Sequence, residues 1–319
     1  MTHLIHNAWP VNFSRSLASF ETHVHGLCNL VRLALLGSGK RAPGSPPTRI
    51  LFASSIAVAG RFPLLNPHGP YEVPETALDA ENTAEFGYPE AKWVCERVLM
   101  AAVEMYGSVY SVEEPLILGS SVRIGQMTGP EKSGVWNESE HIPIVVRASQ
   151  KIRALPVIQG VRYMFTLPSL FSGWVNILTS CRQSLAWMPV NRAGDIMVEL
   201  LFSKGFKPFY HLENPSRQSW DEVLGHLTSI LGGKDTPFPL VPLSDWIGCV
   251  RALGDDPSMN IALKILGFLE RDFERMASGT VILRTALTRE DSLTLVRSTA
   301  LGNIHLEKYI AYWKSVDAA

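Results

Sequence analysis

Short apolar runs alternate with longer stretches of helical spacing in the first half of this chain. The apolar runs predict buried strands, at residues 4–8, 49–55, 116–124 and 209–212. Apolar side chains recur every three or four residues over 17–36 and 88–107, which predicts two helices. Helical spacing predominates in the rest of the chain, over residues 195–202, 220–231, 243–253, 260–276 and 292–313.

The helix predicted from residue 88 carries a phenol and an amine near its start. Tyr88 and Lys92 share one face at their four-residue spacing, and Pro89 suits the first helical position, where its missing N–H costs nothing. A positive charge beside a phenol lowers its pKa, so the pair can act as a general acid near neutral pH. The same spacing also occurs by chance on solvated helices.

Two hydroxyls end the strand that precedes this helix. Ser54 and Ser55 close the apolar run that begins at Arg49, although small polar residues also form ordinary turns. An open α/β sheet places its ligand crevice at the carboxyl ends of its strands. The strand, the two serines and Tyr-x-x-x-Lys on the next helix therefore predict a catalytic site together.

A segment rich in proline and glycine, residues 62–85, separates the serines from the tyrosine. A long stretch without clear periodicity is unusual unless it covers a site, so we predict a lid. Its carboxylates are scattered, which favours a solvated surface over a metal site; they are Glu72, Glu75, Asp79, Glu81 and Glu85. We predict no metal.

The composition excludes some classes of function. The 319 residues are 46% hydrophobic and 18% charged, which is ordinary for a soluble globular protein with a full core. A net charge of −1 gives no electrostatic reason to expect nucleic acid or an anionic membrane as a partner. The four cysteines form no C-x-x-C pair, so we expect reduced thiols in a cytoplasmic protein. The N-terminus lacks the pattern of a secretory signal.

Further motifs resemble one enzyme family over nearly the whole chain. They lie at residues 2–13, 121–130, 136–140, 187–191 and 209–215. With the serines and Tyr-x-x-x-Lys, they look like the thioester reductase domains that end fungal nonribosomal-peptide-synthetase-like and polyketide enzymes. Those domains are relatives of the carboxylic acid reductases in the extended short-chain dehydrogenase/reductase superfamily.

The resemblance implies a Rossmann-like, doubly wound parallel sheet with a mostly helical C-terminal substrate domain. Residues 1–133 would be the C-terminal part of the NAD(P)-binding domain, and residues 134–319 the carrier-facing domain with the return strand. We find no glycine fingerprint: residues 37–39 follow a helix, and residues 232–234 lack the rest of a P-loop. We therefore expect an N-terminally truncated domain with impaired cofactor binding.

The resemblance also implies an activity. NADPH would reduce an acyl thioester on the phosphopantetheine arm of a carrier protein, releasing an aldehyde or an alcohol. Ser55 and Tyr88 would donate hydrogen bonds to the reacting oxygen, and Lys92 would bind the nicotinamide ribose.

The remaining site residues also come from the resemblance. Asn7, Ala8 and Ile124 would contact the NADP(H) cofactor together with Tyr88 and Lys92. Gln126 would face the substrate. The neighbouring Arg123 belongs either to this site or to a structural ion pair, while core packing or strand-end hydrogen bonding is the favoured interpretation for His211, Trp220 and His305.

Two other functions stay open. Another extended reductase or a sugar-nucleotide epimerase would use the same serine, tyrosine and lysine. A non-catalytic remnant would retain Tyr88 and Lys92 without holding the cofactor, and the missing fingerprint favours this alternative.

Residues 163–181 form an uncharged segment between Arg162 and Arg182. Its length suits a membrane span, but a proline, a glycine and five Ser/Thr residues weaken that interpretation. It interrupts two stretches that run together in the resembled domains. We hypothesise that residues 161–182 are an insertion from a translated in-frame intron, disordered or prone to aggregation, which sequencing of the mature transcript would test.

Overall fold

The computed structural model describes most of the chain. The described residues are 1–42, 44–69, 71–107, 115–157, 162–169, 173–180, 184–233, 235–257, 259–271, 273–274 and 279–317. They form two compact units: unit 1 comprises residues 1–127, 188–215 and 281–299, and unit 2 comprises residues 128–187, 216–280 and 300–319. The units interleave along the sequence, whereas our two predicted domains meet once, after residue 133. The roles assigned to those domains stay predictions.

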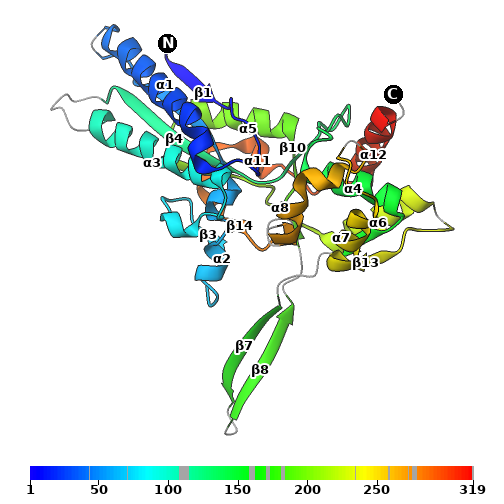
Figure 1. Cartoon of the computed structure of the whole chain (residues 1–319). Coiled ribbons are helices and arrows are strands. Elements are labelled where there is room, and N and C mark those ends of the chain that lie inside the picture. The colour runs from blue at the N-terminus through cyan, green and yellow to red at the C-terminus, as the bar shows by residue number, and fades with distance from the viewer. Residues whose placement is uncertain are drawn as a thin grey trace. The chain divides into compact units, whose positions relative to one another are not determined.

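Unit 1 is built on a parallel sheet of four strands (Figure 1). The order across the sheet is β1 (His3–His6), β2 (Thr48–Ser55), β4 (Ile117–Ile124) and β11 (Phe209–Leu212). Neighbouring strands are parallel in all three pairs. The four predicted strands are thus confirmed, except that β1 ends two residues early and leaves Asn7 and Ala8 beyond the strand. The prediction that β1 is buried is wrong, since Ile5 is exposed and only His6 is buried.

Helices cover both faces of this sheet because alternate side chains of β2 enter two different cores. Ile50 and Phe52 pack with α1 (Glu21–Gly39) and α3 (Gly87–Gly107). Leu51 and Ala53 pack with α5 (Val190–Phe202) and α11 (Leu293–Val296) on the other face. Each large apolar side chain buried in this way contributes about 1.5–3 kcal/mol. The result is the predicted doubly wound α/β fold.

The helix α3 begins at Gly87, one residue before the predicted start, and ends at the predicted Gly107. A close approach explains the glycine. A Cβ atom at position 87 would lie 2.4 Å from the backbone nitrogen of Leu17, at the start of the 3-10 helix η1 (Leu17–Phe20). Only glycine lets the start of α3 lie this close to the segment that links β1 to α1.

The predicted lid is attached to unit 1. Its elements are η2 (Ile56–Ala59), α2 (Phe62–Leu65), β3 (Glu72–Val73) and η3 (Ala80–Asn82). β3 pairs with β14 (Ile282–Leu283), and the carboxylate of Glu75 accepts hydrogen bonds from the backbone of Leu287 and Thr288 at the start of α10 (Ala286–Asp291).

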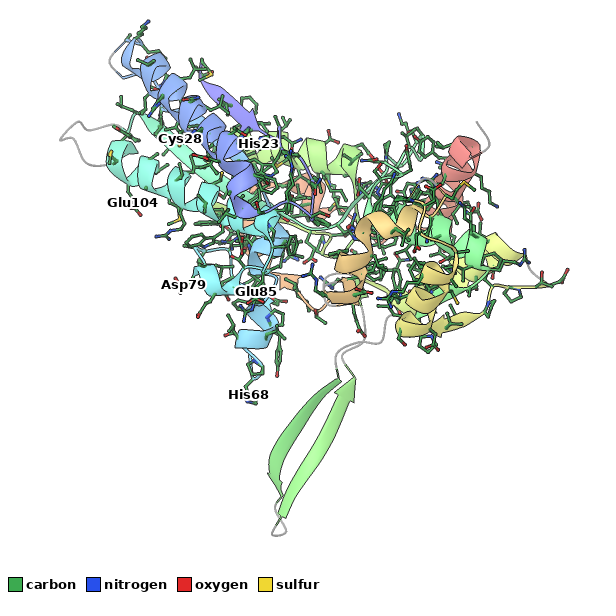
Figure 2. The ribbon with its side chains drawn as sticks, in the orientation of Figure 1. His23, Cys28, His68, Asp79, Glu85 and Glu104 are labelled. Carbon is green, nitrogen blue, oxygen red and sulfur yellow. The ribbon has the colours of Figure 1, made fainter. Side chains whose placement is uncertain are left out.

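The prediction of a solvated acidic surface is therefore wrong for Glu75, which is buried. It holds for Asp79 and Glu85, which are exposed (Figure 2), and Glu85 pairs with Arg61. Among the described residues, no group of three or more His, Cys, Asp or Glu side chains could hold a metal ion.

Unit 2 is mostly helical around an aromatic core. One group of buried rings packs edge-on or tilted in this core; its members are Trp136, Trp187, Trp220, Tyr309 and Trp313. Its helices are α4 (His141–Ile152), α6 (Trp220–Gly232), α7 (Leu243–Ala252), η4 (Ile261–Ile265), α8 (Leu266–Arg271) and α12 (Asn303–Asp317). Its short strands are β6 (Leu155–Val157), β9 (Ser184–Leu185), β12 (Gln218–Ser219) and β13 (Leu240–Pro242). The helical stretch predicted over 292–313 is divided, because residues 297–302 separate α11 from α12.

The remaining short strands are β5 (Met127–Thr128) and β10 (Met188–Pro189). The uncharged segment contributes two strands, β7 (Arg162–Ser169) and β8 (Gly173–Ser180), which pair antiparallel with Arg162 opposite Ser180 (Figure 1). In the described part of the chain they pair with each other alone. Residues 161, 170–172 and 181–182 of the proposed insertion lie outside the described residues, and its origin stays a hypothesis.

The helices that the structure describes include none long and apolar enough to cross a membrane.

Candidate active site

Ser55 stands at the carboxyl end of β2, in register with Ile124 at the end of β4. Its hydroxyl accepts a hydrogen bond from the backbone N–H of Ala57 at 3.2 Å and so caps the short helix η2. Tyr88, in the first turn of α3, shares a hydrogen bond with the Ser55 side chain. The fold therefore brings together the two hydroxyls that the sequence predicted as partners.

Tyr88 is buried, with 8% of its surface exposed, and its ring packs edge-on against Phe13 and Phe20. Burial raises the pKa of the Tyr88 phenol, and the hydrogen bond from Ser55 opposes that shift. We expected the pKa of this phenol to be lowered by Lys92; that expectation is wrong for this structure, because desolvation outweighs the other influences. Tyr88 is consequently a protonated hydrogen-bond donor at neutral pH.

Lys92 lies one turn further along α3 and is 3% exposed. Its Nζ donates to the carbonyl oxygen of Ala53 at 2.6 Å. Three aromatic rings surround the amine, with centroids 4.4 Å away for Trp9, 4.8 Å for Phe52 and 5.8 Å for Tyr88.

Burial lowers the pKa of Lys92 to about 7, while Cys95 and Glu96 raise it. An amine that gains or loses its proton near neutral pH is typical of a functional site.

A buried polar network lies behind these residues. Both oxygens of Glu96, one turn after Lys92 on α3, bind the guanidinium of Arg123 on β4, at 3.1 and 2.8 Å. Ser54 donates to the same carboxylate at 2.5 Å. The interpretation of Arg123 as a member of an ion pair is therefore correct, although that pair lies directly beneath the candidate site.

His211 on β11 extends the network, since its Nε2 is 3.4 Å from Arg123. Its Nδ1 lies 2.8 Å from the carbonyl oxygen of Arg284 and must donate to it, so Nε2 is the acceptor. Burial and the neighbouring Arg123 charge lower the pKa of His211 to about 3, which keeps the ring neutral. His211 is buried and hydrogen-bonded in the core, as predicted.

The residues predicted to contact the cofactor and the substrate lie at or just beyond the carboxyl ends of β1 and β4. Asn7 and Ala8 follow the carboxyl end of β1 and are exposed. Ile124 ends β4 beside Ser55 and is partly buried. Gln126 lies two residues beyond, with its side-chain nitrogen donating to the carbonyl oxygen of Met127 at 2.6 Å. Their contacts with a ligand stay predictions.

The sequence reasoning missed three side chains around Lys92. Trp9 covers the amine, Glu96 fixes the helix face below it, and His6 lies close enough for the Lys92 charge to lower its pKa, after the larger effect of burial. The four-residue spacing from Lys92 to Glu96 was visible in the sequence, but nothing in the sequence placed Arg123 opposite it.

Comparisons with known proteins agree with this geometry. No family model matches the chain. The adenylate-forming reductase of Aspergillus terreus is 35% identical over 319 residues, covering 98% of this chain and 26% of that protein. The 3-methylorcinaldehyde synthase tropA of Talaromyces stipitatus is 32% identical, covering 99% of this chain and 11% of that protein. The chain thus spans about a quarter of the length of the first relative and about a tenth of the second.

Solved structures show the same fold. The terminal R domain from the myxalamid PKS-NRPS biosynthetic pathway matches with a TM-score of 0.68 at 17% identity, covering 99% of this chain and 68% of that one. A dTDP-glucose 4,6-dehydratase from Bacillus anthracis in complex with NAD matches with a TM-score of 0.51 at 13% identity, covering 99% of this chain and 74% of that one. Over nearly its whole length, the chain is therefore homologous to a part of fungal adenylate-forming reductase, nonribosomal-peptide-synthetase-like and polyketide synthase enzymes. It has the Rossmann-like fold of reductase (R) domains and of extended short-chain dehydrogenases/reductases.

Proposed function

We propose that this chain carries the site for NADPH-dependent reductive release of an acyl thioester from a carrier protein. The observation that supports it most is the pair of hydrogen-bonded hydroxyls, Ser55 and Tyr88, at the carboxyl end of β2 with the Lys92 amine one helical turn away. Similarity to the fungal adenylate-forming reductase and synthase enzymes supports the reaction class. The cofactor, the thioester and the carrier are the proposed parts.

The residues present fit the nicotinamide end of such a cofactor. His6 Nε2 and Trp9 Nε1 are buried beside Lys92 and have no hydrogen-bond partner within the described residues. Unpaired buried donors are costly, and ribose hydroxyl groups are partners of the right kind. Asn7 and Ala8 are exposed at the neighbouring strand end, where open α/β sheets bind their ligands.

The bound nicotinamide would supply the hydride, which adds to the carbonyl carbon of the thioester. Charge then develops on the carbonyl oxygen, where Tyr88 and Ser55 would donate hydrogen bonds. Preorganised donors of this kind lower a barrier by a few kcal/mol each, about 3 kcal/mol for one oxyanion-hole group. Because Tyr88 is protonated at neutral pH, it is also placed to pass its proton to that oxygen.

Lys92 would hold the ribose hydroxyls and bring its charge toward the same region. Gln126 would face the acyl group from the end of β4, and the phosphopantetheine arm of the carrier would deliver it. Collapse of the first adduct would break its C–S bond, releasing the aldehyde and leaving the thiol on the phosphopantetheine arm. A second hydride, from another NADPH, would reduce the aldehyde to an alcohol.

A second candidate function is a remnant that binds no cofactor. The link between β1 and α1, residues 7–20, contains no glycine, and residues 37–39 lie at the end of α1 instead of in a strand-to-helix turn. A pyrophosphate cradle of the usual kind needs glycine at such a turn. Another extended reductase or epimerase is the third possibility, since the same three residues would serve it.

Titration calorimetry with NADPH tests the proposal directly. Micromolar binding that is lost in Lys92→Met and retained in Lys207→Met would support it, because both lysines are in unit 1 and only Lys92 lies at the site. Turnover of an acyl-carrier thioester would then separate thioester reduction from epimerase activity. Absence of binding to the full chain would favour the remnant.

A further inference from the structure

The buried network of Ser54, Glu96 and Arg123 is made of residues that lie next to the proposed site residues, either in the sequence or one helical turn away. Ser54 precedes Ser55 on β2, Arg123 precedes Ile124 on β4, and Glu96 lies one turn from Lys92 on α3. Along a strand, adjacent side chains point to opposite faces. The buried contacts of Ser54 and Arg123 therefore help to fix the backbone of the next residue along each strand, and those of Glu96 help to fix the helix that carries Lys92. Ser55, Ile124 and Lys92 are the residues predicted to touch the reactants.

Glu96 is at the centre of this arrangement. It is 1% exposed, Arg123 is 0% exposed, and both carboxylate oxygens are occupied by the guanidinium and by the Ser54 hydroxyl. Its spacing of four residues from Lys92 places both side chains on one face of α3. The carboxylate therefore has a fixed position relative to the amine.

Among the described residues, the other groups that contact Lys92 or affect its charge carry no negative charge at neutral pH. Cys95 is buried, and burial raises the pKa of its thiol to about 12, so it is uncharged at neutral pH. Tyr88 is a neutral phenol, and the pKa of His6 is lowered, which leaves a neutral imidazole. The aromatic rings of Trp9 and Phe52 carry no net charge. Cys95 and Glu96 both act to raise the Lys92 pKa. Because the thiol is uncharged at neutral pH, the buried Glu96 carboxylate, one turn along the same face of α3, is the one of these two groups that carries a negative charge.

We propose that Glu96 is a positioning residue, whose carboxylate, held by Ser54 and Arg123, keeps the buried Lys92 amine charged and in place. The inference deepens the proposed function, on which the use of that charge rests. It assigns the ion pair a role in the chemistry of the site beyond joining α3 to the sheet. Glu96 itself touches neither substrate nor cofactor.

The test follows the protonation of Lys92 without any cofactor. The full chain is labelled with ¹³C at the lysine Cε atoms, its pH titration is followed by NMR, and the Lys92 signal is identified by its loss in Lys92→Met. In the wild type we expect a midpoint near 7. In Glu96→Gln we expect a midpoint lower by about one pH unit, since a nearby opposite charge in a buried place shifts a pKa by about 1–3 units.

A matched control separates this role from stability alone. Glu199 on α5 also accepts several hydrogen bonds, from Ser292 and Thr294, and is also in unit 1. Glu199→Gln should lower stability in urea while leaving the Lys92 midpoint at its wild-type value. If both variants leave that midpoint unchanged, Glu96 is structural and the proposal is overturned.

A second variant keeps the test open if Glu96→Gln fails to fold. Replacing a whole buried ion pair by apolar residues is often neutral for stability, so Glu96→Leu/Arg123→Met is expected to fold. Its Lys92 midpoint should again fall, but by less than in Glu96→Gln, because the positive charge of Arg123 is removed together with the carboxylate. An unchanged midpoint would contradict the proposal. Because no cofactor is involved, this result is independent of whether NADPH binds the wild-type chain.

Discussion

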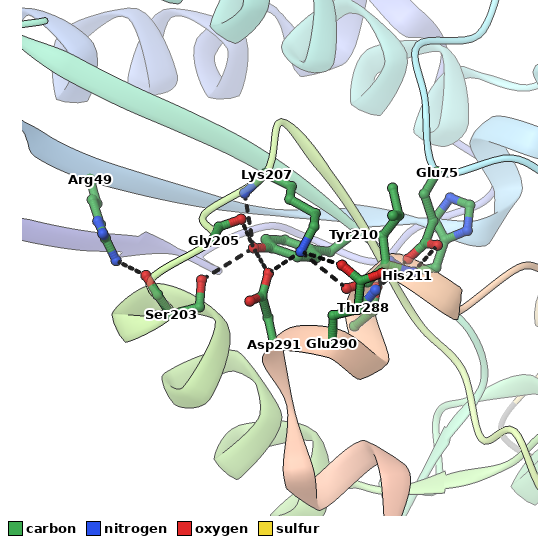
Figure 3. A network of polar contacts seen from close by, with 11 residues as sticks. Arg49, Glu75, Ser203, Gly205, Lys207, Tyr210, His211, Thr288, Glu290 and Asp291 are labelled. Carbon is green, nitrogen blue, oxygen red and sulfur yellow. Dashed lines mark hydrogen bonds and ion pairs between the residues drawn. The ribbon is translucent and has the colours of Figure 1, made fainter.

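Two buried tyrosines in unit 1, Tyr210 and Tyr88, differ in how many of the polar groups around them have hydrogen-bond partners. Tyr210, on β11, donates to Asp291 at 2.7 Å and accepts from the backbone N–H of Lys207 at 2.9 Å (Figure 3). Asp291 in turn receives Lys207 Nζ at 2.5 Å, and Ser203 lies 3.3 Å from the phenol. Each group in this cluster has a polar partner of opposite character.

The surroundings of Tyr88 are less complete. Its phenol shares a hydrogen bond with Ser55. The neighbouring Lys92 amine is largely buried. Two nearby ring nitrogens, His6 Nε2 and Trp9 Nε1, have no hydrogen-bond partner among the described residues. Burial raises the pKa of both phenols. The comparison therefore suggests that Tyr210 stabilises the fold, whereas the free hydrogen-bonding capacity around Tyr88 serves a ligand.

The largest effect expected from this comparison concerns turnover. Tyr88→Phe removes the proposed proton donor without removing the ring, so reduction of an acyl-carrier thioester should fall by about 10²–10⁴-fold. Tyr210→Phe should leave the rate per folded molecule within about twofold. Steady-state NADPH oxidation by the two variants measures both. Equal losses of turnover in the two variants would contradict a catalytic role for Tyr88 and a structural role for Tyr210.

The sequence was sufficient for the sheet and for part of the site. Strands and helices followed from apolar runs because β2 is buried on both faces and α3 has a regular apolar stripe. Ser55 and Tyr88 could be paired because a known sheet geometry brings strand ends and helix starts together. These are local patterns that a single chain displays.

The contacts between distant residues could not be predicted in the same way. Glu75 looked like one more exposed acid, yet it caps a helix more than 200 residues later in the sequence, through Leu287. The raised pKa of Tyr88 depends on burial by Phe13 and Phe20, which no spacing rule supplies. Register and burial decide these features, and both arise only when the chain folds.

The second prediction concerns the stability of the satisfied cluster. Tyr210→Phe leaves Asp291 and the Lys207 N–H without their partner in a buried place, which should lower the free energy of unfolding by about 1–3 kcal/mol. Tyr88→Phe, whose phenol has fewer partners, should lose less than about 1 kcal/mol. Urea unfolding of the two variants and the wild type gives the values. A larger loss for Tyr88→Phe would contradict the assignment of roles.

The third prediction uses the pH dependence of Lys92. Its pKa is lowered from 10.5 to about 7 on folding, so between these pH values the unfolded chain binds more protons than the folded one. Stability contributed by this group therefore rises with pH above 7, by at most about 1.4 kcal/mol per pH unit. The difference in unfolding free energy between wild type and Lys92→Met, measured at pH 7, 8 and 9, should grow in favour of the wild type. Parallel curves would show that the amine is not desolvated.

The smallest expected effect comes from Glu75, which caps the start of α10, the helix that carries Asp291 of the Tyr210 cluster. Glu75 accepts two backbone hydrogen bonds at the start of α10, which carries Asp291 at its other end. Glu75→Gln removes the negative charge near a helix N-terminus and keeps one of the two acceptor oxygens, so one backbone N–H loses its partner and the loss should be about 1 kcal/mol. Because Glu75 lies outside the Tyr88 surroundings, NADPH affinity should stay unchanged while urea unfolding shifts. A loss of affinity without a loss of stability would mean instead that the segment of residues 62–85 acts on the site.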